Sequence, residues 1–251
     1  REPMIIPKFE YADPLLTMEV VFPNGDLFRT GSACVTGATV DAVADGVQPE
    51  GPGIDWFRLF QGAQGTMGVV TWANVKVEYL PQLNKTFFIP FQRIEDAIEP
   101  IYRIQRRMIG HECLLLNNLN LAAILVDRWH EDFQILRRNL PPWTLILVLT
   151  GGRRYPEEKI EYEEEALREI GSELSFPNIL KALPGAPGTE RKLPKLLRKP
   201  WPEEGTYWKF GYKGSCQDLF FHTTLDKVPE FVTAIREVAS KYGYSIADLG
   251  F

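Results

Sequence analysis

The sequence is poor in the residues that build disulfide frameworks and metal sites, with three cysteines and three histidines among 251 residues. Cys34, Cys113 and Cys216 are far apart and odd in number, which argues against a secreted disulfide framework and predicts a reducing, cytoplasmic location. His111 lies close to Cys113, but no CxxC, HxxxH or HExxH spacing accompanies the pair. We therefore expect no metal site.

The sequence also lacks an excess of basic residues and a long hydrophobic run. It has 28 Lys and Arg against 33 Asp and Glu, a net charge of -5, whereas a nucleic-acid partner would require a basic face. The best apolar run, Trp143 to Leu149, is about a third of the roughly 20 residues that a membrane helix needs. We expect neither a nucleic-acid partner nor a membrane span, and interpret this run as a buried strand.

Glycine is concentrated before an apolar segment, where Gly62, Gly65 and Gly68 recur every three residues. After them, Val75, Val77 and Tyr79 alternate with polar residues, which predicts a strand with one buried face. The glycines therefore lead into a strand, whereas the phosphate loops of dinucleotide and nucleoside-triphosphate folds open a helix. The residues alone leave two interpretations open, a bend without a ligand and a close backbone contact with one.

Residues 64–71, Gln-Gly-Thr-Met-Gly-Val-Val-Thr, resemble the flavin-contacting segment (E/Q)GT(L/M)G(I/V)(V/I)T of FAD-linked oxidases and dehydrogenases of the vanillyl-alcohol oxidase and para-cresol methylhydroxylase type. Residues 16–26 resemble the "leVVlpdG" hairpin of the same flavin domain, and residues 53–60 resemble the short helix before the glycines. Residues 116–120 and 218–222 fall where the phenol-oxidising branch has substrate-domain strands.

The resemblance implies FAD as the cofactor and a set of residues that contact it. That set is Gln64, Gly65, Thr66, Met67, Gly68, Val69 and Val70. It also implies an internal piece of a larger flavoenzyme, because family members bind the FAD pyrophosphate on a Gly-rich loop upstream of the hairpin and return to the flavin with a C-terminal segment. Residues 1–81 would be the C-terminal part of the FAD-binding domain, and residues 82–251 an incomplete substrate domain.

The element pattern agrees with two domains. In residues 1–81, strands at 16–22 and 27–30 flank Asn24-Gly25, which suits a two-residue hairpin turn, and 32–53 is interpreted as a loop. From residue 85, strands and helices alternate, which predicts an α+β domain, an antiparallel sheet with helices on one face. Residues 175–207 are expected to be a lid, an interface or disordered.

The expected elements after residue 85 follow from apolar periodicity. Strands are predicted at 86–91, over most of 114–126, and at 144–150. Helices are predicted at 94–108 with a kink or late start at Pro100 and a stop at Gly110, at 127–139, at 156–174 and at 226–242. The inward residues predicted for the first, second and last helices are Ile94, Ala97, Ile98, Ile101, Ile104 and Met108; Trp129, Phe133 and Leu136; and Phe231, Ile235, Val238 and Ala239. The glutamates of 157–173 are interpreted as solvated surface.

The catalytic residues are not identified by the sequence. Pocket residues to consider are Asn118, Asn120, Arg153, Arg154, Cys216 and His222, and no general base is assigned. The resemblance favours hydride transfer from a phenolic alcohol or alkylphenol to FAD, with a 2-hydroxy-acid dehydrogenase of the same flavin family as the alternative. A non-catalytic cap module, or a subunit that pairs with a separate FAD-carrying chain, also stays open, as does a homo-oligomer.

Overall fold

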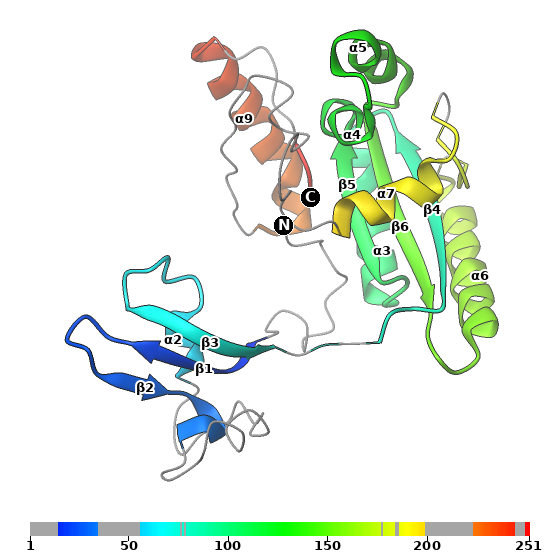
Figure 1. The fold of residues 1–251 in the computed structure, drawn as a ribbon. Helices are drawn as coiled ribbons and strands as arrows, with labels where there is room; N and C mark the ends of the chain where they lie inside the picture. Colours follow the sequence, from blue (N-terminus) through cyan, green and yellow to red (C-terminus); the bar gives the residue numbers. More distant parts are fainter. Residues whose placement is uncertain are drawn as a thin grey trace. The chain divides into compact units, whose positions relative to one another are not determined.

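The computed structural model describes residues 15–34, 56–75, 77, 79–176, 178–183, 186–198, 223–243 and 249–251. The chain divides into two compact units between Tyr79 and Leu80, one comprising Pro7–Tyr79 and the other Leu80–Phe251 with Arg1–Ile6. Each contains a three-stranded antiparallel sheet (Figure 1). The fold is thus mixed α+β, as predicted.

The first unit is built on a sheet of order β2-β1-β3. Its elements are β1 (Leu15–Val21), β2 (Leu27–Arg29), the 3-10 helix η2 (Gly31–Cys34), α2 (Phe57–Phe60) and β3 (Val69–Val75). The predicted hairpin is confirmed, but its loop has three residues: the Phe22 amide donates to the Asp26 carbonyl and the Gly25 amide donates to the Phe22 carbonyl, both at 2.9 Å. Gly25 takes the positive φ, +87°, that this longer loop needs. Residues 32–34 of the predicted loop belong to η2, and residues 35–53 lie outside the described residues.

Strand β3 begins directly after the glycines, as predicted, but ends at Val75. The predicted buried face is wrong, because Val75, Val77 and Tyr79 are 55%, 81% and 74% exposed. Alternation identifies a face able to pack against a core, and it does not ensure that the chain itself supplies the cover.

The second unit is built on a sheet of order β4-β6-β5. Its elements are β4 (Leu83–Phe91), α3 (Glu95–Arg106), β5 (Glu112–Asn117), α4 (Asn118–Leu125), α5 (Trp129–Asn139), β6 (Trp143–Gly151), α6 (Pro156–Leu174), α7 (Thr189–Arg198), the 3-10 helix η3 (Leu225–Lys227) and α9 (Val228–Lys241). Both outer edges of the sheet gain short pairings. Leu180 forms a bridge with Phe88 of β4, and Phe251 exchanges two backbone hydrogen bonds with Leu115 of β5, of 2.6 and 2.8 Å.

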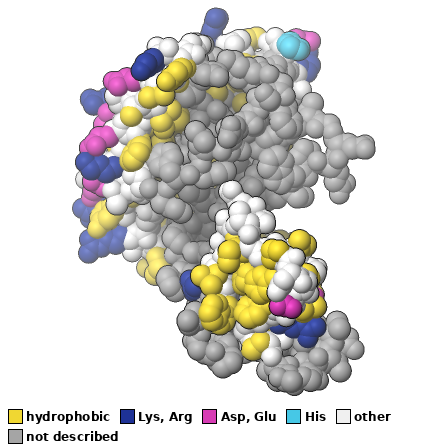
Figure 2. Space-filling model, turned by 90° about the vertical axis from the view of Figure 1, so that its left-hand side faces the viewer, with side chains coloured by type: hydrophobic (Ala, Val, Ile, Leu, Met, Phe, Trp, Pro, Cys, Tyr) yellow, Lys and Arg dark blue, Asp and Glu magenta, His cyan; other side chains and the backbone are white. Residues whose placement is uncertain are grey.

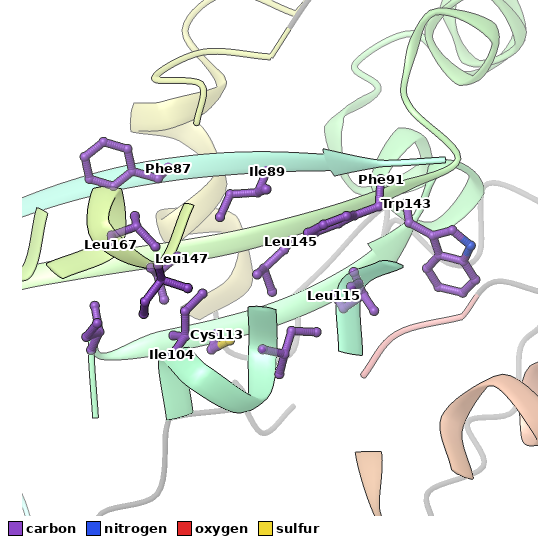
Figure 3. Close-up of a cluster of buried hydrophobic side chains, with 14 of the residues drawn as sticks. Phe87, Ile89, Phe91, Ile104, Cys113, Leu115, Trp143, Leu145, Leu147 and Leu167 are labelled. Carbon is purple, nitrogen blue, oxygen red and sulfur yellow. The ribbon is translucent and has the colours of Figure 1, made fainter. Parts of the chain in front are cut away.

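Helices cover both faces of this sheet, so the prediction of helices on one face is wrong. Leu145, Leu147 and Leu149 of β6 pack in one core with α3, α6 and α9, and Figure 3 shows part of it, with Ile104 and Leu167 reaching the strands. Ile146 and Val148 pack in a second core with α4, α5 and α7. The physical reason is visible in β6 itself, which is buried at all nine positions and carries no polar face to present to water.

The strand predicted over most of 114–126 is also wrong beyond residue 117. The chain turns into α4 there, because the Asn117 side chain accepts a hydrogen bond of 2.9 Å from the Asn120 amide and caps the helix. Helix α3 runs through Pro100 and stops at Arg106, before Gly110. Met108, Phe231 and Val238 are 67%, 40% and 56% exposed, so their predicted inward orientation is wrong.

The remaining helices match their predicted positions closely. Helix α6 begins at Pro156 and buries Ile160, Leu167 and Ile170, and Phe133 and Leu136 of α5 join the second core. The side chain of Trp129 lies outside the described part of the structure. The segment 175–207 is not structureless where it is described, because α7 buries Leu193 against the sheet; residues 199–207 lie outside the described residues.

Two glutamates of α6 are buried rather than solvated, contrary to the prediction for this face. Glu163 and Glu164 are 7% and 6% exposed. Burial opposes ionisation of Glu164, but contacts with Lys85, Arg168 and Lys181 outweigh it and hold its pKa below the ordinary value of 4.5. A hub of three cations around one carboxylate thus ties α6 to β4.

The Glu164 hub predicts acid sensitivity. Since the folded-state pKa is lowered, its stabilisation is fully present above about pH 4.5 and is lost as the pH falls through the folded-state pKa. Glu164→Gln should lower the free energy of unfolding at pH 7 by about 1–3 kcal/mol, and the difference from the parent should shrink towards pH 3. Urea unfolding at both pH values measures this, with the exposed Glu161→Gln as a control of little effect. A constant difference at both pH values would contradict the assignment.

Cys113 offers a probe of the second unit. Burial raises the pKa of its thiol to about 12, whereas Cys34 is exposed. In a Cys34→Ser, Cys216→Ser variant, we expect the Cys113 thiol to react with Ellman's reagent at pH 8 roughly 1,000-fold more slowly in the folded than in the unfolded chain. Comparable rates would show that this core opens readily.

Candidate functional site

The glycine-rich loop between α2 and β3 is the candidate site, and it is built from two consecutive tight turns. The Ala63 amide donates to the Phe60 carbonyl at 3.1 Å, and the Thr66 amide donates to the Ala63 carbonyl at 3.0 Å. The Thr66 hydroxyl also donates to the Ala63 carbonyl, at 2.7 Å. Gln64 has a φ of +50°, an uncommon conformation outside glycine, so the loop has a defined shape.

The three glycines have different roles. A Cβ at Gly62 or Gly65 would meet no atom within 4 Å, although both residues have positive φ. A Cβ at Gly68 would lie 2.6 Å from the Val21 carbonyl oxygen and 2.8 Å from the nearest Val20 side-chain carbon. Gly68 therefore lets β3 approach β1, while Gly62 and Gly65 shape an open turn.

The loop faces solvent rather than packed protein. Met67, Val69 and Val70 are 41%, 68% and 49% exposed. Within the described part of the chain, the amides of Gln64 and Gly65 donate no backbone hydrogen bond. Figure 2 shows hydrophobic side chains gathered on the exposed surface of this unit. The exposed loop thus places backbone amides without a backbone acceptor beside apolar side chains.

A carboxylate network lies where the loop joins the sheet. The Thr71 hydroxyl donates to Glu19 Oε1 at 2.6 Å, and Arg29 Nε donates to Glu19 Oε2 at 2.8 Å. The Thr71 and Arg29 hydrogen bonds hold the pKa of Glu19 below its ordinary value against the opposing effect of burial, with a further hydrogen bond from Trp72. Glu19 is 8% exposed, so this is an internal charge with dedicated partners.

Comparison with known proteins finds two distant relatives. The glycolate oxidase subunit GlcD of Bacillus subtilis is 36% identical over 159 residues, which are 63% of this chain and 29% of that protein. The mitochondrial D-lactate dehydrogenase (cytochrome) of Arabidopsis thaliana is 29% identical over 169 residues, 65% of this chain and 26% of that protein. By distant homology over part of its length, the chain is related to the FAD-linked oxidase family.

A solved structure has a similar fold. A crystal structure of p-cresol methylhydroxylase with substrate bound matches with a TM-score of 0.53 and 19% identity, over 78% of this chain and 39% of that chain. No family model matches the sequence. The chain spans less than a third of the length of the two relatives named above.

The geometry of the loop suits contact with the flavin ring of FAD, the cofactor for which these oxidases are named. A flat ring system can reach backbone atoms only where no side chain stands in the way. The space beside Gly62 and Gly65 is open in this sense. The Thr66 hydroxyl donates within the loop, so its oxygen is left to act as an acceptor. Gln64 to Val70 therefore stay the predicted flavin contacts.

The other predicted pocket residues are not brought together. Asn118 and Asn120 open α4 beside the Trp143 end of β6, whereas Arg153 and Arg154 follow its other end. The nine-residue strand between them spans roughly 27–30 Å. The Asn118 side chain donates to the Arg137 carbonyl at 3.3 Å. Cys216, His222 and residues 218–222 lie outside the described residues.

Sequence reasoning missed Glu19 and Arg29, which only the strand register brings together. The one available signal was a charged residue within the apolar β1 segment. Over the described ranges, no group of three or more His, Cys, Asp or Glu side chains is arranged to hold a metal ion. Helices in the same ranges are too short or too polar to cross a membrane.

Proposed function

We propose that the chain is part of an FAD-dependent oxidoreductase that oxidises a small 2-hydroxy acid, and that Gln64–Val70 contact the flavin. The observation that carries the proposal is the open, glycine-shaped turn at the entrance to β3, in a chain related to FAD-linked oxidases. The flavin would accept a hydride from the substrate carbon that bears the hydroxyl group, leaving a 2-oxo acid once the hydroxyl proton is lost.

The substrate class follows the relatives rather than the first expectation from the sequence. The two relatives are named for glycolate and D-lactate, which are both 2-hydroxy acids. The phenol-oxidising p-cresol methylhydroxylase matches at 19% identity, a likeness of fold alone. The alternative from the sequence, a 2-hydroxy-acid dehydrogenase, therefore becomes the proposal.

The roles of the loop residues follow from their geometry. The amides of Gln64 and Gly65 would donate to polar atoms at the edge of the ring system, and Met67 and Val69 would give its face apolar contact. Gly68 would keep the start of β3 against β1, so that these groups stay aligned. Thr66 would add a hydroxyl oxygen.

The proposal extends to domain roles and partners. Residues 1–81 would supply part of the flavin site, and residues 82–251 part of the substrate domain. The Bacillus subtilis relative is by name one subunit of an oxidase, which supports a search for further chains that complete the site. A cytoplasmic location stays a prediction.

The test is flavin reduction by candidate substrates. We would express the chain together with any coding sequence that adjoins it, add FAD, remove oxygen, and record the flavin absorbance. The proposal expects bleaching on addition of D-lactate or glycolate and none with p-cresol or 4-hydroxybenzyl alcohol. Bleaching by the phenols alone would overturn the substrate class, and protein that stays colourless in FAD would overturn the flavin function.

A further inference from the structure

The pairing of β1 with β3 contains an irregularity at the end of the predicted flavin contacts. Val21 pairs with Val69 and Val20 with Val70, but Glu19 pairs with Trp72. From the Val20–Val70 pair to the Glu19–Trp72 pair, β1 advances by one residue and β3 by two. Thr71 is therefore the extra residue of a β-bulge. A bulge at this point sets which face each of Met67, Val69 and Val70 presents.

The Glu19 carboxylate binds the residue that forms the bulge. The Thr71 hydroxyl donates to it at 2.6 Å, and Trp72 is the residue that pairs with Glu19. Arg29, from the other neighbouring strand, donates at 2.8 Å and neutralises the charge. One side chain of the central strand therefore connects β2, β1 and the bulge of β3.

A second hydrogen bond ends this shifted stretch of pairing. The register shifts again between Thr17 and Leu15 of β1, where the Asn74 side chain donates to the Thr17 hydroxyl at 2.9 Å. Side-chain hydrogen bonds thus mark both ends of the segment in which β3 is displaced by one residue. A shift of one residue would move every side chain of β3 to the opposite face.

We propose that Glu19 is a positioning residue, whose carboxylate fixes the register of β3 and thereby the placement of the Gln64–Val70 loop. The consequence for flavin rests on the proposed function, whereas the register claim does not. Without the carboxylate, the hydroxyl of Thr71 and the charge of Arg29 lose their shared acceptor on β1. The bulge itself is then left with the weaker 3.4 Å hydrogen bond from the Thr71 hydroxyl to the Glu19 backbone carbonyl, and the Asn74–Thr17 hydrogen bond holds only the far end of the shifted stretch.

The test compares Glu19→Val and Thr71→Val with the control Thr71→Ser, which keeps the hydroxyl. Cross-strand NOEs report the register, and the Phe28–Val20 NOE reports whether the β1-β2 hairpin remains folded. In both valine variants we expect the backbone pairings of position 19 with Trp72 and of Met18 with Ala73 to be lost or shifted. The Phe28–Val20 signal of the hairpin should persist. The serine variant should keep the parental pairings.

FAD affinity provides the second measurement. We expect the dissociation constant for FAD to rise about 10- to 100-fold in the valine variants, because each variant loses one or two hydrogen bonds to a charged group. The rate of Cys113 labelling should stay unchanged, because Cys113 lies in the second unit. Parental register in both valine variants would overturn the proposal, even if their stability falls. If the parent binds no FAD, the proposed function fails while the NOE result still decides the register claim. Should Glu19→Val fail to fold, Thr71→Val decides it alone.

Discussion

Alanine at Gly68 should disrupt the first unit far more than alanine at Gly65. The new Cβ would lie 2.6 Å from a backbone oxygen of Val21, which cannot move without breaking the β1-β3 ladder. The residue also has a φ of +151°, which an L side chain rarely adopts. We expect a loss of about 3–5 kcal/mol in the free energy of unfolding of this unit, together with loss of flavin binding.

Gly65→Ala is the matched control, because its Cβ enters open space and only the positive φ is strained. We expect it to cost about 1 kcal/mol. Hydrogen exchange of the peptide spanning Leu15–Val21 measures both variants in the same experiment. Equal destabilisation by the two substitutions would show that the approach of β3 to β1 does not depend on the missing side chain.

Ile146→Ala should destabilise the second unit as strongly as Leu147→Ala. These neighbours point to opposite faces of β6 and are 1% and 0% exposed, in two separate cores. Each truncation removes buried carbon and leaves a cavity, which costs about 2–5 kcal/mol. A sheet covered on one face only would make one of the two substitutions nearly silent.

Urea unfolding measures the loss of free energy of unfolding in the Ile146→Ala and Leu147→Ala variants, provided that the m-value stays constant. Ile135→Ala is the control, because Ile135 is 61% exposed on α5 and alanine favours a helix; its effect should stay within about 0.5 kcal/mol. A large effect at Leu147 with none at Ile146 would contradict the two-core description.

Local signals in the sequence were sufficient for many elements of the fold. The hairpin at Asn24-Gly25, the helix opened by Pro156 and the strand from Trp143 each carry their own turn or periodicity signal, and all are present. The strand predicted beyond Asn117 failed because an apolar run does not distinguish a buried helix from a strand. The prediction of helices on one face of the sheet failed because β6, which is buried at all nine positions, was interpreted without asking what covers its second face.

The candidate site was predictable only in part. The glycines identified a turn that leads into a strand, and the resemblance identified a family. The separate role of Gly68 depends on a contact with Val21 across the sheet, and the Glu19 network depends on a bulge. Both arise from pairing between residues about 50 positions apart, which spacing along the chain does not encode.

Hydrogen exchange with and without saturating FAD tests the central claim most directly. The amides of Gln64 to Val70 should exchange more slowly when FAD is present, and those of helix α5, in the second unit, should be unchanged. Protection confined to other segments, or no protection at this loop while FAD is bound, would contradict the account.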